Sequence, residues 1–212
     1  MRHLALLARP PSAGGKTRLT SGLSESRAIL LRASLFLDTL DSARSLGVPV
    51  TIFGTPTDLR DELCALATGL AVLPQSDGDL GARMHAAFTA LFEHGAHHVV
   101  LIGSDLPTLP PSHLGAAFGA LEAGADLVIG PAYDGGYYLI GMSRPVPEVF
   151  EGIAWGGVGV LQATHAIAGS AGLRVHEVAA WYDVDTAIDL ERVVSGSEPA
   201  RHTRRWMDTS AG

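Results

Sequence analysis

The sequence predicts a single α/β domain, a three-layer sandwich in which helices cover both faces of a mostly parallel sheet. Short apolar runs alternate with longer amphipathic segments, the pattern of strands joined by crossover helices. The 212 residues are 47% hydrophobic and 17% charged, so the chain can bury a core without disulfides or metals. We expect the domain to span 1–194. The tail 195–212 is rich in Ser, Gly and Arg, shows no periodicity, and is expected to be mobile or used in packing.

Each expected element follows from its apolar spacing. The strands are His3–Ala8, Val48–Phe53, Leu70–Leu73, Val99–Gly103, Asp126–Gly130, Tyr137–Met142 and Leu173–Val178. The helices are Ser24–Leu46, Thr57–Ala67, Asp79–His94, Pro111–Ala123, Val158–Ala168 and Thr186–Val194. Pro49 favours a place toward the sheet edge for the second strand, whereas Pro111 suits a first helical turn. Gly47, Gly95 and Gly124 are typical residues after a helix end.

Charge and cysteine content exclude several classes of function. The net charge of −7, from 15 basic and 22 acidic residues, disfavours nucleic-acid binding, which prefers the opposite sign. The single cysteine, Cys64, excludes an internal disulfide and a cysteine zinc site, and it suits a small core position. No apolar run approaches the ~18 residues of a membrane span, and the first strand is too short for a signal-peptide core. We therefore expect a cytoplasmic protein with no membrane partner.

The loops that follow the strands carry the unusual residues, and ligands of open α/β sheets bind at that edge. The first loop spans Arg9–Leu19, and its Gly14 and Gly15 let the backbone approach an anion closely. Lys16, the only lysine of the sequence, and Arg18 add positive charge, so the loop suits a di- or triphosphate. A P-loop needs a further glycine at position 10, which is proline here, so a P-loop kinase is a minor alternative.

Carboxylates follow two later strands. Ser104 and Asp105 follow a buried strand, where an aspartate could hold a divalent cation against phosphates or cap the next helix. Asp183 and Asp185 alternate before the last helix, so they share one face if the segment is extended. One of them could approach the metal, or both could serve the helix start, where Thr186 is a candidate N-cap.

Two further loops are candidate substrate contacts. A tight turn between the fifth and sixth strands contains Asp134, Gly135, Gly136 and Tyr137. The turn could contact substrate, or it could only close a hairpin. The segment after the third strand offers Gln75, Gly78, Asp79, Gly81 and Arg83 to a base, ribose or acceptor. Asp79 could instead cap the following helix. The histidines lack the spacing of metal ligands, and no Gly-x-Ser-x-Gly elbow indicates a hydrolase.

Taken in order, the segments KTRL, QSDGDLGARM, LIGSDLPTLP, GPAYDGGYYLIG and YDVDTAIDL resemble an uncharacterised bacterial family of the DUF2064 type. The resemblance covers about residues 3–194 and implies a nucleotide-diphospho-sugar transferase (GT-A-like) fold and a divalent cation, Mg²⁺ or Mn²⁺. Related families are phospholactate guanylyltransferases and, more distantly, molybdenum-cofactor nucleotidyltransferases.

By position, the resemblance implies Lys16 and Arg18 in the triphosphate loop, Asp105 as the metal carboxylate, and Asp183 or Asp185 near the metal. The first loop is about one residue shorter than usual, and Ala13 stands where the family often has proline. Gly156-Gly157 also replaces a frequent Ser-Thr pair, which weakens the inference about the acceptor.

We expect an enzyme that uses a nucleotide, either an NTP or an NDP-sugar, and a small-molecule acceptor. The favoured reaction is metal-dependent nucleotidyl transfer from an NTP to a small phosphorylated acceptor. Glycosyl transfer from an NDP-sugar is the alternative, and a nucleotide-binding regulator without turnover is an alternative of another class.

Overall fold

A computed structural model describes residues 1–209 and confirms the predicted sheet. Seven strands pair in the order β3-β2-β1-β4-β6-β5-β7. They are β1 (Arg2–Ala8), β2 (Val50–Gly54), β3 (Ala71–Pro74), β4 (His98–Ile102), β5 (Leu127–Pro131), β6 (Tyr137–Met142) and β7 (Val175–Glu177). Within this sheet β6 is antiparallel to its neighbours β4 and β5, and the other pairings are parallel. The second strand, β2, lies next to the edge strand β3.

All six predicted helices are present, with ends shifted by a residue or two. The helices are α1 (Thr17–Thr20), α2 (Glu25–Arg44), α3 (Arg60–Leu66), α4 (Leu80–Glu93), α5 (Pro111–Glu122), α6 (Val160–Ser170), α7 (Ala187–Ser195) and α8 (Arg201–Asp208). Short 3₁₀ turns occupy Pro11–Ala13, Thr57–Leu59 and Pro147–Phe150. The expected helix at 57–67 is therefore divided into a 3₁₀ turn and α3. The sequence reasoning missed α1, α8 and the other two 3₁₀ turns.

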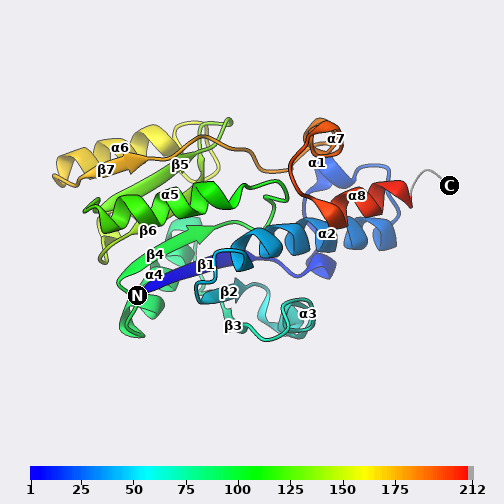
Figure 1. Ribbon diagram of the computed structural model, residues 1–212, viewed down its shortest axis with the longest axis horizontal. Coiled ribbons are helices and arrows are strands. Elements are labelled where there is room, and N and C mark those ends of the chain that lie inside the picture. Colours follow the sequence, from blue (N-terminus) through cyan, green and yellow to red (C-terminus); the bar gives the residue numbers. More distant parts are fainter. Residues whose placement is uncertain (210–212) are drawn as a thin grey trace.

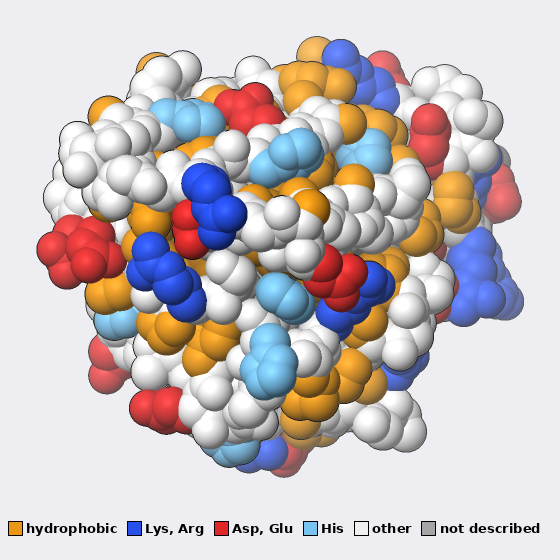
Figure 2. Space-filling model, turned by 60° about the vertical axis from the view of Figure 1, so that its left-hand side comes forward, with side chains coloured by type: hydrophobic (Ala, Val, Ile, Leu, Met, Phe, Trp, Pro, Cys, Tyr) orange, Lys and Arg blue, Asp and Glu red, His pale blue; other side chains and the backbone are white. Residues whose placement is uncertain are grey.

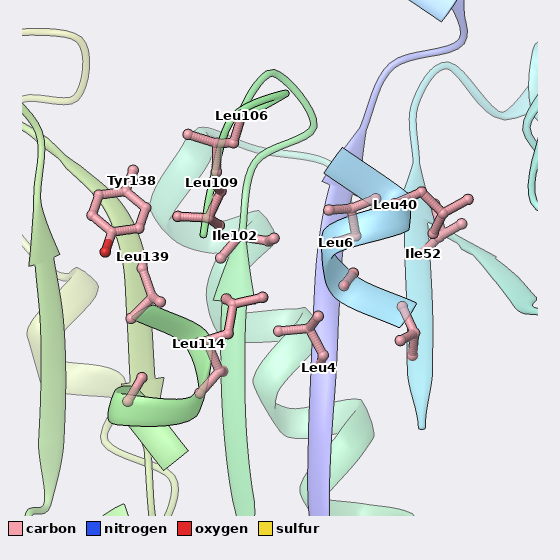
Figure 3. Packing of buried hydrophobic residues seen from close by; sticks show 14 of the residues in the cluster. Leu4, Leu6, Leu40, Ile52, Ile102, Leu106, Leu109, Leu114, Tyr138 and Leu139 are labelled. Carbon is pink, nitrogen blue, oxygen red and sulfur yellow. The ribbon is translucent and has the colours of Figure 1, made fainter. Parts of the chain in front are cut away.

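Helices cover both faces of the sheet, as Figure 1 shows. On one face, apolar side chains of α2, α3 and α5 pack on the sheet, and Figure 3 shows Leu4, Leu6 and Ile102 meeting Leu40 and Leu114. On the other face, α4, α6 and the turn at Pro147–Phe150 enclose a second apolar cluster. Because both faces are buried, the central strands are near-continuous apolar runs.

The strand order reverses at β1, which lies between β2 and β4. The chain passes from β1 to β2 and β3 on one side, then returns to β4 on the other side. In open α/β sheets such a switch point leaves a crevice outside the carboxyl ends of the strands. The loops that follow β1 and β4 therefore begin side by side at one edge of the sheet.

The segment after residue 194, expected to be mobile or used in packing, packs on the domain and contains a helix that was not predicted. Residues 201–208 form α8, which packs along α2 and α7, so this part of the chain packs on the domain (Figure 1). The buried carboxylate of Asp38 on α2 accepts hydrogen bonds from the backbone N–H groups of His202 and Thr203, at 2.9 and 2.8 Å. It also accepts one from the Thr203 hydroxyl. Residues 210–212 of the expected tail lie outside the described residues.

The Asp38→Ala variant is expected to lose about 2–3 kcal/mol of unfolding free energy. The substitution leaves two backbone donors and one buried hydroxyl at the start of α8 without their acceptor. Urea denaturation followed by circular dichroism measures the loss. Asp38→Asn keeps one side-chain carbonyl oxygen and should lose less. An alanine variant within 0.5 kcal/mol of the parent, about the range of a surface substitution, would contradict this role.

Among the described residues, no helix combines the length and the apolar character that crossing a bilayer requires. On the face shown in Figure 2, basic, acidic and histidine side chains are interspersed and do not gather by charge.

Candidate active site

Two adjoining cavities lie at the carboxyl edge of the sheet. The larger, about 530 Å³, is formed by the 132–137 turn, the 155–160 segment and the start of α7. The smaller, about 290 Å³, is formed by the ends of β1 and β4, part of β6 and the first turn of α4. Leu80, Tyr137 and Asp183 line both. A ligand bound across these three residues would occupy both cavities.

The loop after β1 has an unusual backbone. Gly14, Gly15 and Lys16 are three successive residues with positive φ, at 73°, 95° and 52°. Added Cβ atoms on the two glycines would meet nothing within 4 Å, so the conformation and not the space requires glycine there. Left-handed conformations of this kind turn backbone amides toward an anion. The buried Arg32 of α2 fixes the loop, because its guanidinium donates to the carbonyls of Pro11 and Gly15 at 2.7 and 3.3 Å.

Lys16 meets the predicted carboxylates. Its Nζ lies 3.0 Å from Asp105 Oδ2 and 2.5 Å from Asp185 Oδ1, and it donates to the Val184 carbonyl at 2.9 Å. Arg18 lies at the rim, with its guanidinium 3.5 Å from Asp185 Oδ2. The structure thus brings together four of the predicted site residues from the loops after β1, after β4 and before α7.

In the cluster formed by Lys16, Arg18, Asp105, Asp183 and Asp185, the carboxylates outnumber the cations. Burial lowers the pKa of Lys16, but the attraction of Asp105 and the hydrogen bond with Asp185 outweigh it, so the pKa is raised overall. Burial raises the pKa of Asp105 despite the neighbouring ammonium. The pKa of Asp183, which is reached by water in the cavities, rises to about 7 because of desolvation and then of the charge on Asp105. Carboxylate oxygens are the preferred ligands of a divalent cation, and its charge would offset theirs, so the kind of side chain fits such an ion. In this structure the ligand atoms of Asp105, Asp183 and Asp185 do not all lie within 4.8 Å of one another, and Lys16 lies on two of the three carboxylates.

Substitution of Asp183 by asparagine is expected to stabilise the fold at high pH. The pKa of about 7 exceeds the ~3.9 of an unfolded aspartate, so the unfolded chain ionises first and stability falls as the pH rises from 4 to 7. Above pH 7 the loss is complete. Allowing for the solvent that reaches this group, we expect a gain of about 1 kcal/mol at pH 8, a rise in Tm of about 2–4 °C.

Melting curves of both proteins between pH 4 and pH 8 measure this effect. The two melting temperatures should converge as the pH falls toward 4. A difference that is constant with pH would show that the Asp183 carboxylate does not titrate in this range.

The smaller cavity holds several of the other predicted nucleotide contacts. Arg9, Gln75, Arg83 and Ser104 line it, together with Asp105. The Gln75 amide nitrogen donates to the carbonyls of Ala8 and Phe53, at 3.1 and 2.8 Å, and so ties β3 to β1 and β2. With both amide hydrogens used, Gln75 can offer a ligand only the carbonyl oxygen of its side chain.

Two predicted contacts in the α4 segment have structural roles. The Asp79 side chain accepts a hydrogen bond from Ala82 N at 2.9 Å, so it caps α4, the alternative named above. Gly81 is buried against the indole of Trp155, where an added Cβ would lie 2.6 Å from the ring. A glycine is therefore needed at position 81 to make room for Trp155 and not for a ligand. Gly78 has φ 108° and leads into this turn.

The turn after β5 forms one wall of the larger cavity. Gly136 N donates to Asp134 Oδ1 at 3.0 Å, which holds the turn together. Gly135 has φ 91°, and an added Cβ would lie 2.3 Å from the Val158 carbonyl. The turn therefore packs directly on the 155–160 segment. Tyr137, the fourth predicted residue here, lies between the two cavities.

The two aspartates before α7 do not cap that helix. Thr186 is the N-cap, as expected, and it forms a reciprocal capping box with Asp189. Asp105 does not cap α5 either, because that helix begins at Pro111 and has no side-chain cap. None of the three predicted metal carboxylates is therefore used as a helix cap, although Asp105 and Asp185 pair with Lys16.

Several residues of the larger cavity were not predicted. The rings of Tyr133 and Tyr182 stack 6.5 Å apart, and the Arg192 guanidinium lies 5.6 Å from the Tyr182 ring centre. The sequence holds a signal for Arg192. Within the predicted helix Thr186–Val194, Arg192 follows Asp189 by three residues, so the two side chains share one helix face.

A second group of possible metal ligands lies outside this site. Ligand atoms of Asp38, Asp41 and His202 lie within 4.8 Å of one another. However, both Asp38 oxygens accept hydrogen bonds from the start of α8, and Asp41 pairs with Arg201 at 2.9 Å. These contacts already account for the cluster as a cap and ion pair that hold α8.

Sequence comparisons find a matching family and a relative of known name. Residues 39–157 match the family described as an uncharacterized protein conserved in bacteria (DUF2064). A 3-phospho-D-glycerate guanylyltransferase of Phenylobacterium zucineum (strain HLK1) is 30% identical over 148 residues, which are 68% of this chain and 67% of that protein.

Solved structures extend the likeness to the whole chain. A candidate nucleotide-diphospho-sugar transferase of Desulfovibrio desulfuricans G20 has a TM-score of 0.91 at 32% identity, covering 99% of this chain and 95% of that one. Rv0371c of Mycobacterium tuberculosis H37Rv has a TM-score of 0.60 at 21% identity, covering 92% and 98%. Rv0371c has also been crystallised with manganese. The predicted GT-A-like fold is thereby confirmed.

Proposed function

The chain belongs to the DUF2064 family of bacterial proteins, which it matches over residues 39–157, and we propose that it transfers a nucleotidyl group from a nucleoside triphosphate to a small phosphorylated acceptor. The observation that carries the proposal is the position of Lys16 Nζ between Asp105 and Asp185, beside two joined cavities. The nucleotide occupies the smaller cavity and the acceptor the larger one. A 30% identical relative named 3-phospho-D-glycerate guanylyltransferase supports this proposal.

The reaction joins the two ligands at the boundary between the cavities. A phosphate oxygen of the acceptor attacks the α-phosphorus, the bond to the β-phosphate oxygen breaks, and pyrophosphate leaves. Asp105, Asp183 and Asp185 would hold Mg²⁺ or Mn²⁺, which supplies charge neutralisation on the phosphates. The amides of residues 14–16 and the ammonium of Lys16 bind the departing pyrophosphate. Positioning and electrostatic stabilisation of this kind supply most of the rate in phosphoryl chemistry.

The test is a panel of the four common ribonucleoside triphosphates with 3-phospho-D-glycerate and other phosphate monoesters, each with Mg²⁺ or Mn²⁺. Acceptor-dependent release of pyrophosphate, with a product heavier than the acceptor by one nucleotidyl group, is the expected result. NDP-sugars form a parallel arm, in which release of a nucleoside diphosphate would replace the proposal by glycosyl transfer. Thermal stabilisation by nucleotides without any product would replace it by a regulatory role.

A further inference from the structure

The charged side chains of the larger cavity are unequally paired. Of its four aspartates, Asp185 contacts Lys16 and Arg18, Asp189 accepts hydrogen bonds from Thr186 and from the Asp185 backbone, and Asp134 accepts one from Gly136 N. Asp183 lies at the junction with the smaller cavity. Arg192, by contrast, has no ion-pair partner among the described residues. It lines the cavity, and no carboxylate lies within ion-pair distance of its guanidinium.

Arg192 is also held in place. Its guanidinium carbon lies 5.6 Å from the centre of the Tyr182 ring, within the range of a cation–π contact. The Tyr182 ring also contacts the rings of Trp181, at 5.5 Å, and Tyr133, at 6.5 Å. A planar guanidinium fixed against a stacked ring loses less freedom on binding a carboxylate than a mobile side chain would.

The cavity exceeds what a phosphate group alone requires. Its volume of about 530 Å³ falls in the range of sites that enclose a whole small ligand. The reacting phosphate must lie near Asp183, where the two cavities meet. Arg192 is therefore placed to contact a part of the acceptor other than the reacting phosphate.

We propose that Arg192 is an acceptor-binding residue that recognises a second anionic group, a carboxylate, on the phosphorylated acceptor. The guanidinium fork matches a carboxylate with two parallel hydrogen bonds. This inference rests on the proposed function, and it narrows the acceptor class to phosphate monoesters that also carry a carboxylate. Arg9 and Arg83 line the smaller cavity, so they are placed to meet the nucleotide and not this group.

Two probes that differ in one group test the inference. 3-Phospho-D-glycerate carries a carboxylate where glycerol 3-phosphate carries a hydroxymethyl group. Calorimetry with Mn²⁺ and a non-hydrolysable GTP analogue should show 3-phospho-D-glycerate binding about tenfold more tightly to the parent protein. Arg192→Met should remove about this tenfold preference, equivalent to about 1.4 kcal/mol, and Arg192→Lys should keep part of it.

Arg60→Gln is the matched control, since Arg60 is an exposed arginine of α3 that lines neither cavity. It should keep the full preference. Failure of the parent protein to bind 3-phospho-D-glycerate more tightly, or an Arg192→Met variant with an unchanged preference, overturns the inference. Pyrophosphate release in the panel above is a separate measurement. Turnover without a preference that depends on Arg192 would leave the proposed function standing and remove the carboxylate subsite.

Discussion

Replacement of Asp105 by asparagine is expected to lower nucleotidyl transfer by about 10²–10³-fold or more, the scale of losing one preorganised electrostatic contact at a reacting centre. Asparagine keeps the size of the side chain, but it removes the charge that Lys16 meets at 3.0 Å. Because burial disfavours the charged carboxylate, the neutral substitute should not lower the melting temperature.

Three measurements distinguish a lost site from a lost fold. Mn²⁺ binding, followed by electron paramagnetic resonance, should weaken strongly in Asp105→Asn, while the circular dichroism spectrum and the melting curve stay those of the parent. Asp58→Asn, which changes an exposed aspartate of the turn at Thr57–Leu59, is the control and should leave both activity and Mn²⁺ binding unchanged. Parent-like Mn²⁺ binding by Asp105→Asn would remove this residue from the metal site.

The second large effect is expected at Lys16. The Lys16→Met variant should lose about 10²–10³-fold in turnover, because the cation that faces the departing pyrophosphate is gone. Without nucleotide, however, the same variant should bind Mn²⁺ more tightly, by about fivefold or about 1 kcal/mol. The ammonium lies on Asp105 and Asp185, at 3.0 and 2.5 Å, and so competes with a divalent cation for these oxygens.

Opposite changes in turnover and in cation affinity identify this competition. General damage to the loop would weaken both. Lys16→Arg should not restore the parent, because a planar guanidinium cannot replace the compact ammonium that meets two carboxylates and the Val184 carbonyl. Weaker Mn²⁺ binding by Lys16→Met would show that the ammonium does not compete for the site.

The proximity of Lys16 to Asp105 could be predicted because it depends on topology. Both residues follow neighbouring parallel strands, and alternating apolar runs are enough to indicate such strands. Asp185 could be expected near Lys16 and Asp105 because it lies in the loop before the last helix. These positions required no knowledge of side-chain packing.

Other features depend on contacts that local sequence does not show. The cap of α8 comes from Asp38, 165 positions before Thr203, so no local pattern marks that helix. Gly81 was assigned to substrate because a glycine that admits Trp155 has the same sequence signature as one that admits a ligand. Arg192 was not predicted because it lies in the last turns of α7, where an arginine has the same pattern as one on a solvated helix face.

The two polar anchors on α2 have a consequence for shortened chains. Arg32 hydrogen-bonds to the loop that follows β1, and Asp38, six positions further along α2, hydrogen-bonds to the start of α8. A protein cut at residue 194 would expose apolar residues of α2 that cluster with Trp206 of α8, among them Leu31 and Leu35, on the same helix that holds the loop of Lys16. We expect such a protein to lose the proposed activity because the loop of Lys16 is displaced, although Lys16, Asp105 and Asp185 are all kept.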